Sequence, residues 1–480
     1  MTTFGKPIIK NNLEIMLPNN KIFVFLPDGV GLRNFCYSNF YDTGKKMDFD
    51  IIYWNATPFN VSEFGYKEIK ILNSKTHFLT DVFKNAKKHI ELSLSVKKFN
   101  DSTYTTYRFP FSFSSFKIAI KSVFTKLIIF FFSTEKGLKF INNKINNLER
   151  KTPYYKNVIA VLKVEKPAMV FCTNQRVTAA IAPLLAAHDL GISTATFIFS
   201  WDNVPKATLL VTTDYYFVWS NYMKNELLNY YPEINKNQVI VTGTPQFENH
   251  FDVNRIINKE VFFSQNGLNF SKKYICYSGD DVTTCPDDAK YLEDVAIAVE
   301  KLNEKGNNLG IVFRRCPVDF SNRYDYVLEK YKNVITPIVP KWQKIVEGWN
   351  NILPLKEDLD LQTNTIFYTE MVVNLGSSMV FDYAIFNKPC AYLNYDVTDK
   401  IEKNWSVEKI YNYVHFRSMQ SKNAVIWLNS ADEIANKIET VLTDSSVVVK
   451  NAKDWFEIIN ESKPNLASFR IWNEIKNIVK

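Results

Sequence analysis

The sequence is poor in the residues that build metal sites and covalent cross-links. Its five histidines are isolated and show no metal-ligand spacing. The six cysteines are scattered, mostly within apolar strand-like segments, and form no Cys-x-x-Cys pair. We therefore expect buried free thiols in a reducing compartment, with neither a disulfide framework nor a bound metal.

Long apolar segments and targeting sequences are also missing. The longest notable apolar run, Leu127–Phe132, is far too short to cross a bilayer. The first twenty residues are polar and lack the hydrophobic segment of a signal peptide. The sequence thus predicts a cytoplasmic protein, with contact at the inner face of a membrane left open.

What is present describes a folded two-domain protein. The chain has 480 residues, of which 46% are hydrophobic and 22% charged, and a chain of this length normally forms two domains. Apolar strand-like and helical segments alternate along much of it, which predicts parallel sheets covered by helices. A polar stretch at about 250–273 interrupts the alternation. We therefore predict two Rossmann-like domains, residues 1–250 and 251–480, with a cleft between them.

The strands of the first domain are expected at Lys21–Leu26, Asp50–Trp54, Ala168–Cys172, Thr194–Phe199, Tyr215–Trp219 and Val239–Val241. Those of the second are expected at Tyr274–Ser278, Gly310–Phe313, Val334–Val339, Met371–Asn374 and Cys390–Tyr395, followed after Asp396 by mostly helical segments.

Residues 97–145 form a basic, Phe-rich insertion. They contain nine Lys and Arg, two acids and ten Phe, within a chain whose net charge is only +8. The segment Phe116–Phe131 places apolar side chains on one helical face and lysines toward the other. Such a helix either lies on an anionic membrane surface or packs in the core with a solvated basic face. Nucleic acid is not expected, because the patch is confined and no nucleic-acid module accompanies it.

Four polar clusters follow predicted strands, where open α/β sheets bind ligands. The first-domain clusters contain Asp28, Gly29, Gly31 and Arg33; Ser200, Trp201, Asp202, Asn203 and Lys206; and Gly243, Pro245 and Gln246. The second-domain cluster contains Gly279, Asp280, Arg314, Arg315, Gly376, Ser377, Ser378 and Asp382.

The segment Met371–Asp396 is the most informative of these. It predicts a strand, a tight turn at 375–378, a helix of about ten residues and a second strand. Ser377 and Ser378 either donate hydroxyls to a phosphate at the start of the helix or only cap it.

Two further ambiguities concern charged groups. Arg314 and Arg315 either bind a phosphate or pair with a local acid such as Asp319. The pairs at 280–281 and 287–288 are interpreted as loop and helix-cap aspartates rather than metal ligands.

The layout resembles the GT-B class of glycosyltransferases. NLGSSMVFDYAIFNKPCAYLNYD is similar to the donor-site segment of CDP-glycerol glycerophosphotransferases and related bacterial surface-polysaccharide transferases. FIFSWDN, DYYFVWS and VTGTPQFE resemble segments of bacterial UDP-glycosyltransferase-like proteins. The resemblance implies that Ser377 and Ser378 bind donor phosphate and that Asp382 binds ribose. No histidine other than His250 lies near a cluster in the sequence, which counts against glycerol-phosphate transfer.

In an inverting transferase a carboxylate takes the proton from the acceptor hydroxyl. Asp28 and Asp202 are the two candidates, and each is alternatively only a turn or cap residue. Trp201 either stacks on an acceptor sugar or is buried.

The leading hypothesis is a metal-independent glycosyltransferase that uses a nucleotide-sugar as co-substrate, needs no cofactor and extends a surface glycan or lipid-linked glycan. The alternatives are a CDP-glycerol-type polyol-phosphate transferase, a UDP-GlcNAc 2-epimerase-like enzyme, and a non-catalytic nucleotide-sugar-binding subunit.

Overall fold

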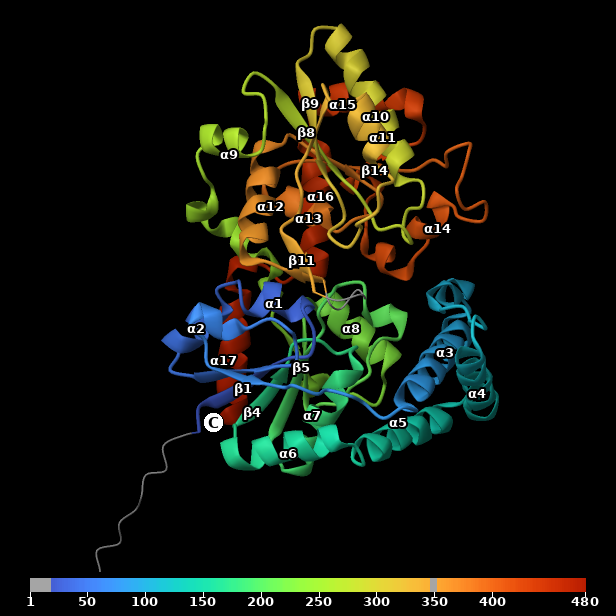
Figure 1. The fold of residues 1–480 in the computed structure, drawn as a ribbon, viewed down its shortest axis with the longest axis vertical. Helices are drawn as coiled ribbons and strands as arrows, with labels where there is room; N and C mark the ends of the chain where they lie inside the picture. The colour runs from blue at the N-terminus through green and yellow to red at the C-terminus, as the bar shows by residue number, and fades with distance from the viewer. Residues whose placement is uncertain (1–18, 346–351) are drawn as a thin grey trace, which may run out of the picture.

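The computed structural model describes residues 19–345 and 352–480, and it contains two parallel sheets stacked along the long axis of the molecule (Figure 1). The first sheet has the order β3-β2-β1-β4-β5-β6-β7. Its strands are β1 Lys21–Leu26, β2 Asp50–Asn55, β3 Glu68–Lys70, β4 Met169–Cys172, β5 Ser193–Phe197, β6 Tyr215–Val218 and β7 Val239–Val241. Nearly all of their apolar side chains are buried because helices cover both faces.

The second sheet has the order β10-β9-β8-β13-β14-β15. Its strands are β8 Lys273–Ser278, β9 Leu309–Arg314, β10 Ile335–Pro337, β13 Val372–Asn374, β14 Cys390–Leu393 and β15 Ile426–Leu428. Two short strands, β11 Trp342–Lys344 and β12 Ile352–Pro354, pair antiparallel outside it. The sequence did not indicate β3, β11, β12 or β15, each of which has only three residues.

Helices of the first half are α1 Val30–Phe35, α2 Phe40–Lys46, α3 Thr80–Phe99, α4 Phe116–Phe132, α5 Glu135–Glu149, α6 Pro153–Glu165, α7 Ile181–Asp189 and α8 Asn221–Tyr230. Those of the second half are α9 Lys259–Gln265, α10 Asp288–Glu304, α11 Asp325–Lys330, α12 Lys356–Tyr368, α13 Met379–Ile385, α14 Val407–Tyr411, α15 Ile434–Thr443 and α16 Ser446–Ile459.

The last helix, α17 (Ala467–Val479), returns to the first half (Figure 1). Its Trp472 is fully buried against the rings of Phe40 and Phe49 and donates its indole N–H to the Phe40 carbonyl at 2.7 Å. The division of the chain near residue 250 stays a prediction, since the end of the chain is built into the first half.

Helix α4 lies on the outside of the molecule beside α3 and α5 (Figure 1). Its buried side chains are the small polar Ser122 and Thr125, whereas Phe116, Phe124 and Phe131 are 84%, 55% and 70% exposed. The interpretation of this segment as a core helix is therefore wrong. Within the described ranges, no helix has the length and apolarity required to span a bilayer.

Candidate functional site at the junction of the sheets

Asp28 closes the turn between β1 and α1. Its carboxylate accepts hydrogen bonds from the Val30 N–H at 3.2 Å and the Asn174 side-chain amide at 2.9 Å. Burial raises the pKa of Asp28, while the nearby Arg176 guanidinium and these hydrogen bonds act in the opposite direction. The residue thus holds the turn and remains a better proton acceptor than an ordinary aspartate.

Gly29 and Gly31 allow two close approaches in the same turn. A Cβ on Gly29 would lie 1.9 Å from Cδ2 of Leu353 in β12, and a Cβ on Gly31 would lie 2.4 Å from Oγ1 of Thr173. Leu353 is fully buried. The β11–β12 hairpin of the second half is therefore seated directly on the first turn of the first half.

Asp202, in the loop after β5, is held by its neighbours. Its carboxylate accepts hydrogen bonds from Ser200 Oγ at 2.5 Å and Asn203 Nδ2 at 2.8 Å, and it forms an ion pair with Lys206. Burial would raise the pKa of Asp202, but the Lys206 ammonium and the hydrogen bonds hold it well below its usual range. Asp202 is consequently the weaker base of the two candidates.

Trp201 packs between the two halves. Its side chain is 7% exposed and lies edge-to-face against His415 at 4.9 Å, Phe381 at 5.4 Å and Trp455 at 5.8 Å. The structure thus favours the buried alternative over stacking on a sugar. The fold also brings His415, which is remote from every cluster in the sequence, beside Trp201.

The turn after β7 is also part of the junction. Gly243 has a φ of +77°, and the Thr244 N–H donates to Asn460 Oδ1 at 3.1 Å. Pro245 is buried, and Gln246 lines a small cavity of about 150 Å³ together with Arg33. The same cavity is lined by Gly29 and Ser200 from the first half and by Val318, Trp342 and Ile352 from the second. The carboxyl ends of both sheets therefore meet at one place.

Arg314, at the end of β9, forms a buried ion pair that the sequence did not identify. Its Nη2 lies 2.9 and 2.8 Å from the two carboxylate oxygens of Asp358 in α12. Asp319, the acid suggested by the sequence, pairs instead with Arg323 at 2.7 Å. Arg315 lies over the Tyr324 ring and donates to the Ser321 carbonyl at 3.4 Å.

Gly376, Ser377 and Ser378 form the turn into α13 and remain partly exposed. Gly376 has a φ of +66°, which favours glycine. The Ser377 hydroxyl accepts the Met379 N–H at 3.3 Å, and the Ser378 side chain makes no capping hydrogen bond. Helix α13 has seven residues rather than about ten. Ser377 therefore caps the helix, whereas the Ser378 hydroxyl takes no part in capping.

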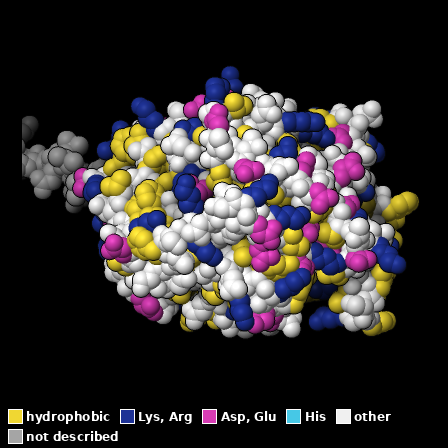
Figure 2. Space-filling model, turned by 90° about the horizontal axis from the view of Figure 1, so that it is seen from above, with side chains coloured by type: hydrophobic (Ala, Val, Ile, Leu, Met, Phe, Trp, Pro, Cys, Tyr) yellow, Lys and Arg dark blue, Asp and Glu magenta, His cyan; other side chains and the backbone are white. Residues whose placement is uncertain are grey.

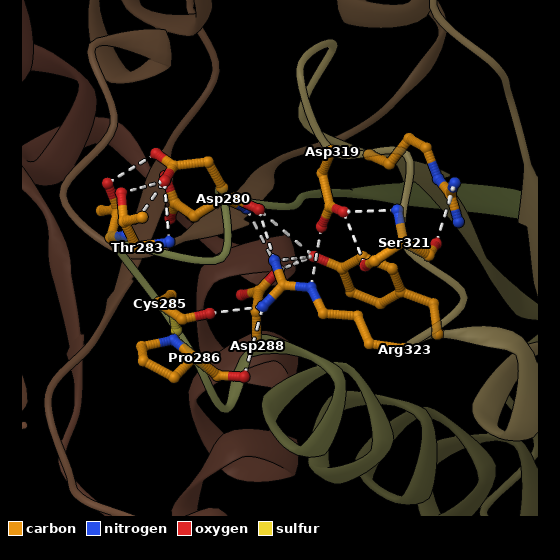
Figure 3. A network of polar contacts seen from close by, with 12 residues as sticks. Asp280, Thr283, Cys285, Pro286, Asp288, Asp319, Ser321 and Arg323 are labelled. Carbon is orange, nitrogen blue, oxygen red and sulfur yellow. Dashed lines mark hydrogen bonds and ion pairs between the residues drawn. The ribbon is translucent and has the colours of Figure 1, made fainter. Parts of the chain in front are cut away.

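A polar network fixes the loop after β8 (Figure 3). The Arg323 guanidinium donates to Asp319 Oδ2 at 2.7 Å and to the carbonyls of Asp280 and Cys285 at 2.5 Å each. Gly279 donates its N–H to the Arg314 carbonyl at 2.9 Å.

Asp280 lies close to the serine turn. Burial and repulsion from Asp288 and Asp281 raise the pKa of Asp280 well above its usual range, and a backbone hydrogen bond from Leu375 partly opposes them. Leu375 immediately precedes Gly376, so Asp280 lies near the start of the serine turn. The fold thus brings together two predicted segments that are about a hundred residues apart.

Arg33 connects the halves at the centre of the junction. Its Nη2 donates to Gln362 Oε1 at 2.6 Å, and burial lowers the pKa of Arg33, with Asp382 and Asp358 opposing that effect and Arg314 adding to it. Asp382 is buried and lies 2.6 Å from His250 Nε2, so its carboxylate faces the first half of the chain.

The two arginines each keep an unused donor. Among the residues that the structure describes, Arg33 Nε and Arg314 Nη1 are buried without a hydrogen-bond partner. Buried guanidinium donors are normally satisfied, and carboxylate or phosphate oxygens suit them best. The junction therefore holds unsatisfied cationic donors from both halves, and Arg33 lines the small cavity there.

A larger cavity of about 520 Å³ adjoins the small one and shares Phe199 and Ser200 with it. Its cations include Lys84 and Lys88 of α3, which were not among the site residues predicted from the sequence. Only their i, i+4 spacing, which places both on one helical face, could have indicated them.

No protein-family model matches the chain, and a search of curated proteins found no match to its sequence. Solved structures match over nearly the whole length. The S. aureus MnaA–UDP structure aligns with a TM-score of 0.51 and 15% identity over 95% of this chain and 96% of that one. A glycosyltransferase from Rickettsia africae aligns with a TM-score of 0.51 and 10% identity, over 96% of this chain and 99% of that one. A UDP-N-acetylglucosamine 2-epimerase aligns with a TM-score of 0.53 and 13% identity over 96% of each chain. At these identities the similarity shows the fold, which is GT-B-like as predicted.

Proposed function

We propose that this chain is a glycosyltransferase that moves a sugar from a nucleotide-sugar donor to a glycan or lipid-linked glycan of a bacterial surface polysaccharide. The observation that carries the proposal is the pair of unused guanidinium donors, Arg33 Nε and Arg314 Nη1, at the junction of two GT-B-like halves. A donor diphosphate bound there would satisfy both and would offset their mutual repulsion. The partly exposed serines 377 and 378 are the second phosphate contact in the proposal.

In this mechanism the acceptor hydroxyl attacks the sugar carbon while the nucleoside diphosphate leaves. Arg33 and Arg314 stabilise the charge that develops on the leaving phosphate. A carboxylate accepts the proton of the hydroxyl. Asp28 suits this role better than Asp202, because the pKa of Asp28 is raised and that of Asp202 is strongly lowered. We retain Asp202 as a residue that positions Lys206 beside the acceptor.

The nucleotide is tested first, by the thermal shift of the full chain with UDP, GDP, CMP and CDP. UDP is the first choice because the S. aureus structure above contains it. A ligand that binds only the folded state raises the melting temperature. Arg33→Gln should remove most of that shift, whereas Arg150→Gln, which alters an exposed pair with Asp189, should keep it. A shift that survives Arg33→Gln and Arg314→Gln alike would contradict the proposed phosphate site.

Product analysis separates the proposed reaction from its main rival. The similarity to a UDP-N-acetylglucosamine 2-epimerase supports a second candidate, an enzyme that converts a nucleotide-sugar without any acceptor. A transferase consumes little donor until an acceptor is added, and an epimerase needs none. A non-catalytic binding subunit would bind the nucleotide and give no product in either case.

The exposed face of α4 supports contact with an anionic membrane. In this proposal the protein is cytoplasmic and binds the membrane peripherally. Phe116, Val123, Phe124, Leu127 and Phe131 are between 47% and 84% exposed on this helix. Lys117, Lys121 and Lys126 lie on the same helix, which contains no acid. Figure 2, which views the molecule from above, shows acidic and basic side chains mixed over the visible surface, with hydrophobic side chains gathered mainly at the left and in smaller groups elsewhere. Apolar anchors combined with lysines are typical of helices that lie in a lipid headgroup region.

A further inference from the structure

The cavity of about 520 Å³ lies at the carboxyl ends of β4 and β5, against the side of α3. Arg176 comes from the loop after β4, where its guanidinium lies 4.5 Å from the centre of the Phe199 ring. Asp202 and Lys206 come from the loop after β5. Because Ser200 lines both this cavity and the small one at the junction, a molecule bound here would reach the proposed donor site.

Cations outnumber acids in this cavity by five to two. The cations are Lys84, Lys87, Lys88, Arg176 and Lys206, and the acids are Glu91 and Asp202. Each acid has a cation partner of its own: Asp202 pairs with Lys206, and Glu91 lies 3.7 Å from Lys87. Within the described part of the chain, Lys84 and Lys88 form no salt bridge. Lys84 and Lys88 therefore add positive charge that the two acids lining the cavity, each held by another cation, do not pair with.

This arrangement costs stability in the absence of an anion. Burial lowers the pKa of Lys88 to about 8, and repulsion from Lys206, Lys84 and Arg176 contributes to the shift. The pKa of Lys84 is also lowered, first by burial, with Arg176 adding to it and Asp81 opposing it. Clustered like charges with perturbed pKa values, when they line a cavity, are typical of a binding site.

A second cavity of about 1110 Å³ continues from the first and shares Glu91, Ala207 and Leu210 with it. Part of its lining is apolar, including Leu94 of α3, Leu138 of α5, Leu184 and Leu185 of α7, and Pro205, and the rest is polar or charged, including Lys97, Lys98 and Lys139. Helices α3 and α5 also support α4, the helix with the exposed apolar face. The lysine-lined cavity is thus continuous with a larger cavity of mixed lining, whose leucines lie mainly on α3, α5 and α7.

We propose that the pocket of Lys84, Lys88, Arg176 and Lys206 binds the phosphate or diphosphate head of the acceptor, and that the adjoining cavity holds the acceptor's apolar chain. The inference rests on the proposed function and narrows it to an amphipathic, anionic acceptor. Lysine and arginine side chains suit phosphate oxygens, and the apolar part of the adjoining cavity, with Leu94, Leu138, Leu184 and Leu185, suits a hydrocarbon chain.

The test is isothermal titration of the full chain with inorganic pyrophosphate, farnesyl diphosphate and farnesol, each with and without saturating UDP. Because saturating UDP occupies the proposed donor site, the pyrophosphate affinity measured in its presence is that of the lysine pocket alone. We expect Lys84→Gln/Lys88→Gln to weaken pyrophosphate binding tenfold or more while leaving the UDP affinity unchanged. The matched control is Lys45→Gln/Lys46→Gln, a change of equal charge at the exposed end of α2, which lines neither cavity; this variant should bind as wild type.

Farnesyl diphosphate that binds more tightly than pyrophosphate supports a lipid-linked acceptor. Equal affinities would overturn the assignment of the adjoining cavity to an apolar chain and would indicate a water-soluble phosphorylated acceptor in the lysine pocket. Equal pyrophosphate binding by wild type and Lys84→Gln/Lys88→Gln would overturn the proposal, as would farnesol binding as tightly as farnesyl diphosphate. If no nucleotide binds, the proposed function fails, whereas a lysine-dependent pyrophosphate affinity would still stand. The double variant relieves repulsion and should melt no lower than wild type, so a folding defect does not confuse the result.

Discussion

His250 Nε2 lies 2.6 Å from Asp382 Oδ1, and both side chains are almost completely buried. His250 comes from the segment after the first sheet, whereas Asp382 lies in α13 of the second half. The carboxylate that the family resemblance assigns to ribose is therefore engaged by a histidine across the junction. We infer that Asp382 positions α13, and with it the serine turn, relative to the first half.

Removing one member of this pair should destabilise the fold. His250→Ala leaves a buried carboxylate without its partner, and a hydrogen bond to a charged group contributes about 1.5–3 kcal/mol. Urea unfolding of His250→Ala, Asp382→Ala and the double variant measures the coupling between the two side chains. Strictly additive losses in that cycle would show that the contact contributes nothing.

The close contact between Gly29 and Leu353 of β12 is tested by adding one methyl group at Gly29. Gly29→Ala places a Cβ where Leu353 Cδ2 lies, and overpacking of this kind costs about 1–3 kcal/mol. Leu353→Ala alone should cost about 2–5 kcal/mol through the cavity it leaves. The double variant should be more stable than the sum of the two losses predicts. Additivity in thermal melts would mean that the hairpin is not held at Gly29.

The serine turn is tested through nucleotide affinity. Ser377→Ala/Ser378→Ala should weaken binding of the stabilising nucleotide severalfold or more, because each hydrogen bond to a charged phosphate is worth about 1.5–3 kcal/mol. Ser445→Ala is the matched control, since Ser445 precedes α16 and also makes no side-chain capping bond. Calorimetric affinities that are equal for all three proteins would remove these serines from the donor site.

The fold was largely predictable, because apolar runs such as Lys21–Leu26 and Cys390–Leu393 identify buried parallel strands without reference to the rest of the chain. The site was predictable only in position, at the strand ends. Which groups meet there depends on contacts such as Arg314 with Asp358 and His250 with Asp382, which are 44 and 132 residues apart. Periodicity also cannot tell which face of a helix packs inward, which is why α4 remained ambiguous.

Membrane contact by α4 is tested by flotation with vesicles that contain anionic lipid. Lys117→Glu/Lys121→Glu/Lys126→Glu should strongly reduce the bound fraction, since each lysine near an anionic surface contributes about 1 kcal/mol. The control with the same charge change is Lys403→Glu/Lys409→Glu/Lys422→Glu, all exposed in the second half. High salt should weaken wild-type binding, whereas neutral vesicles should retain only the contribution of the exposed phenylalanines. Equal flotation of the two triple variants would contradict the assignment.

The lysine pocket predicts a pH-dependent stability. Below pH 8 Lys88 is charged in both states, and in the folded state burial and repulsion from Lys206, Lys84 and Arg176 disfavour that charge. Between pH 8 and about 10.4, the usual lysine value, the folded state loses the proton while the unfolded state keeps it, so stability rises with pH.

Replacing Lys88 with an uncharged side chain should therefore remove a cost that exists mainly near neutral pH. Lys88→Met should raise the melting temperature at pH 7 by an amount on the order of 1–2 °C, and the gain should shrink as the pH approaches 10. Lys46→Met, at the exposed end of α2, should show no such trend. With saturating pyrophosphate at pH 7, Lys88→Met should melt below wild type rather than above it. The bound anion then pairs with Lys88, and the methionine variant lacks that contact. A gain that is independent of pH would mean that Lys88 is limited by packing rather than by charge.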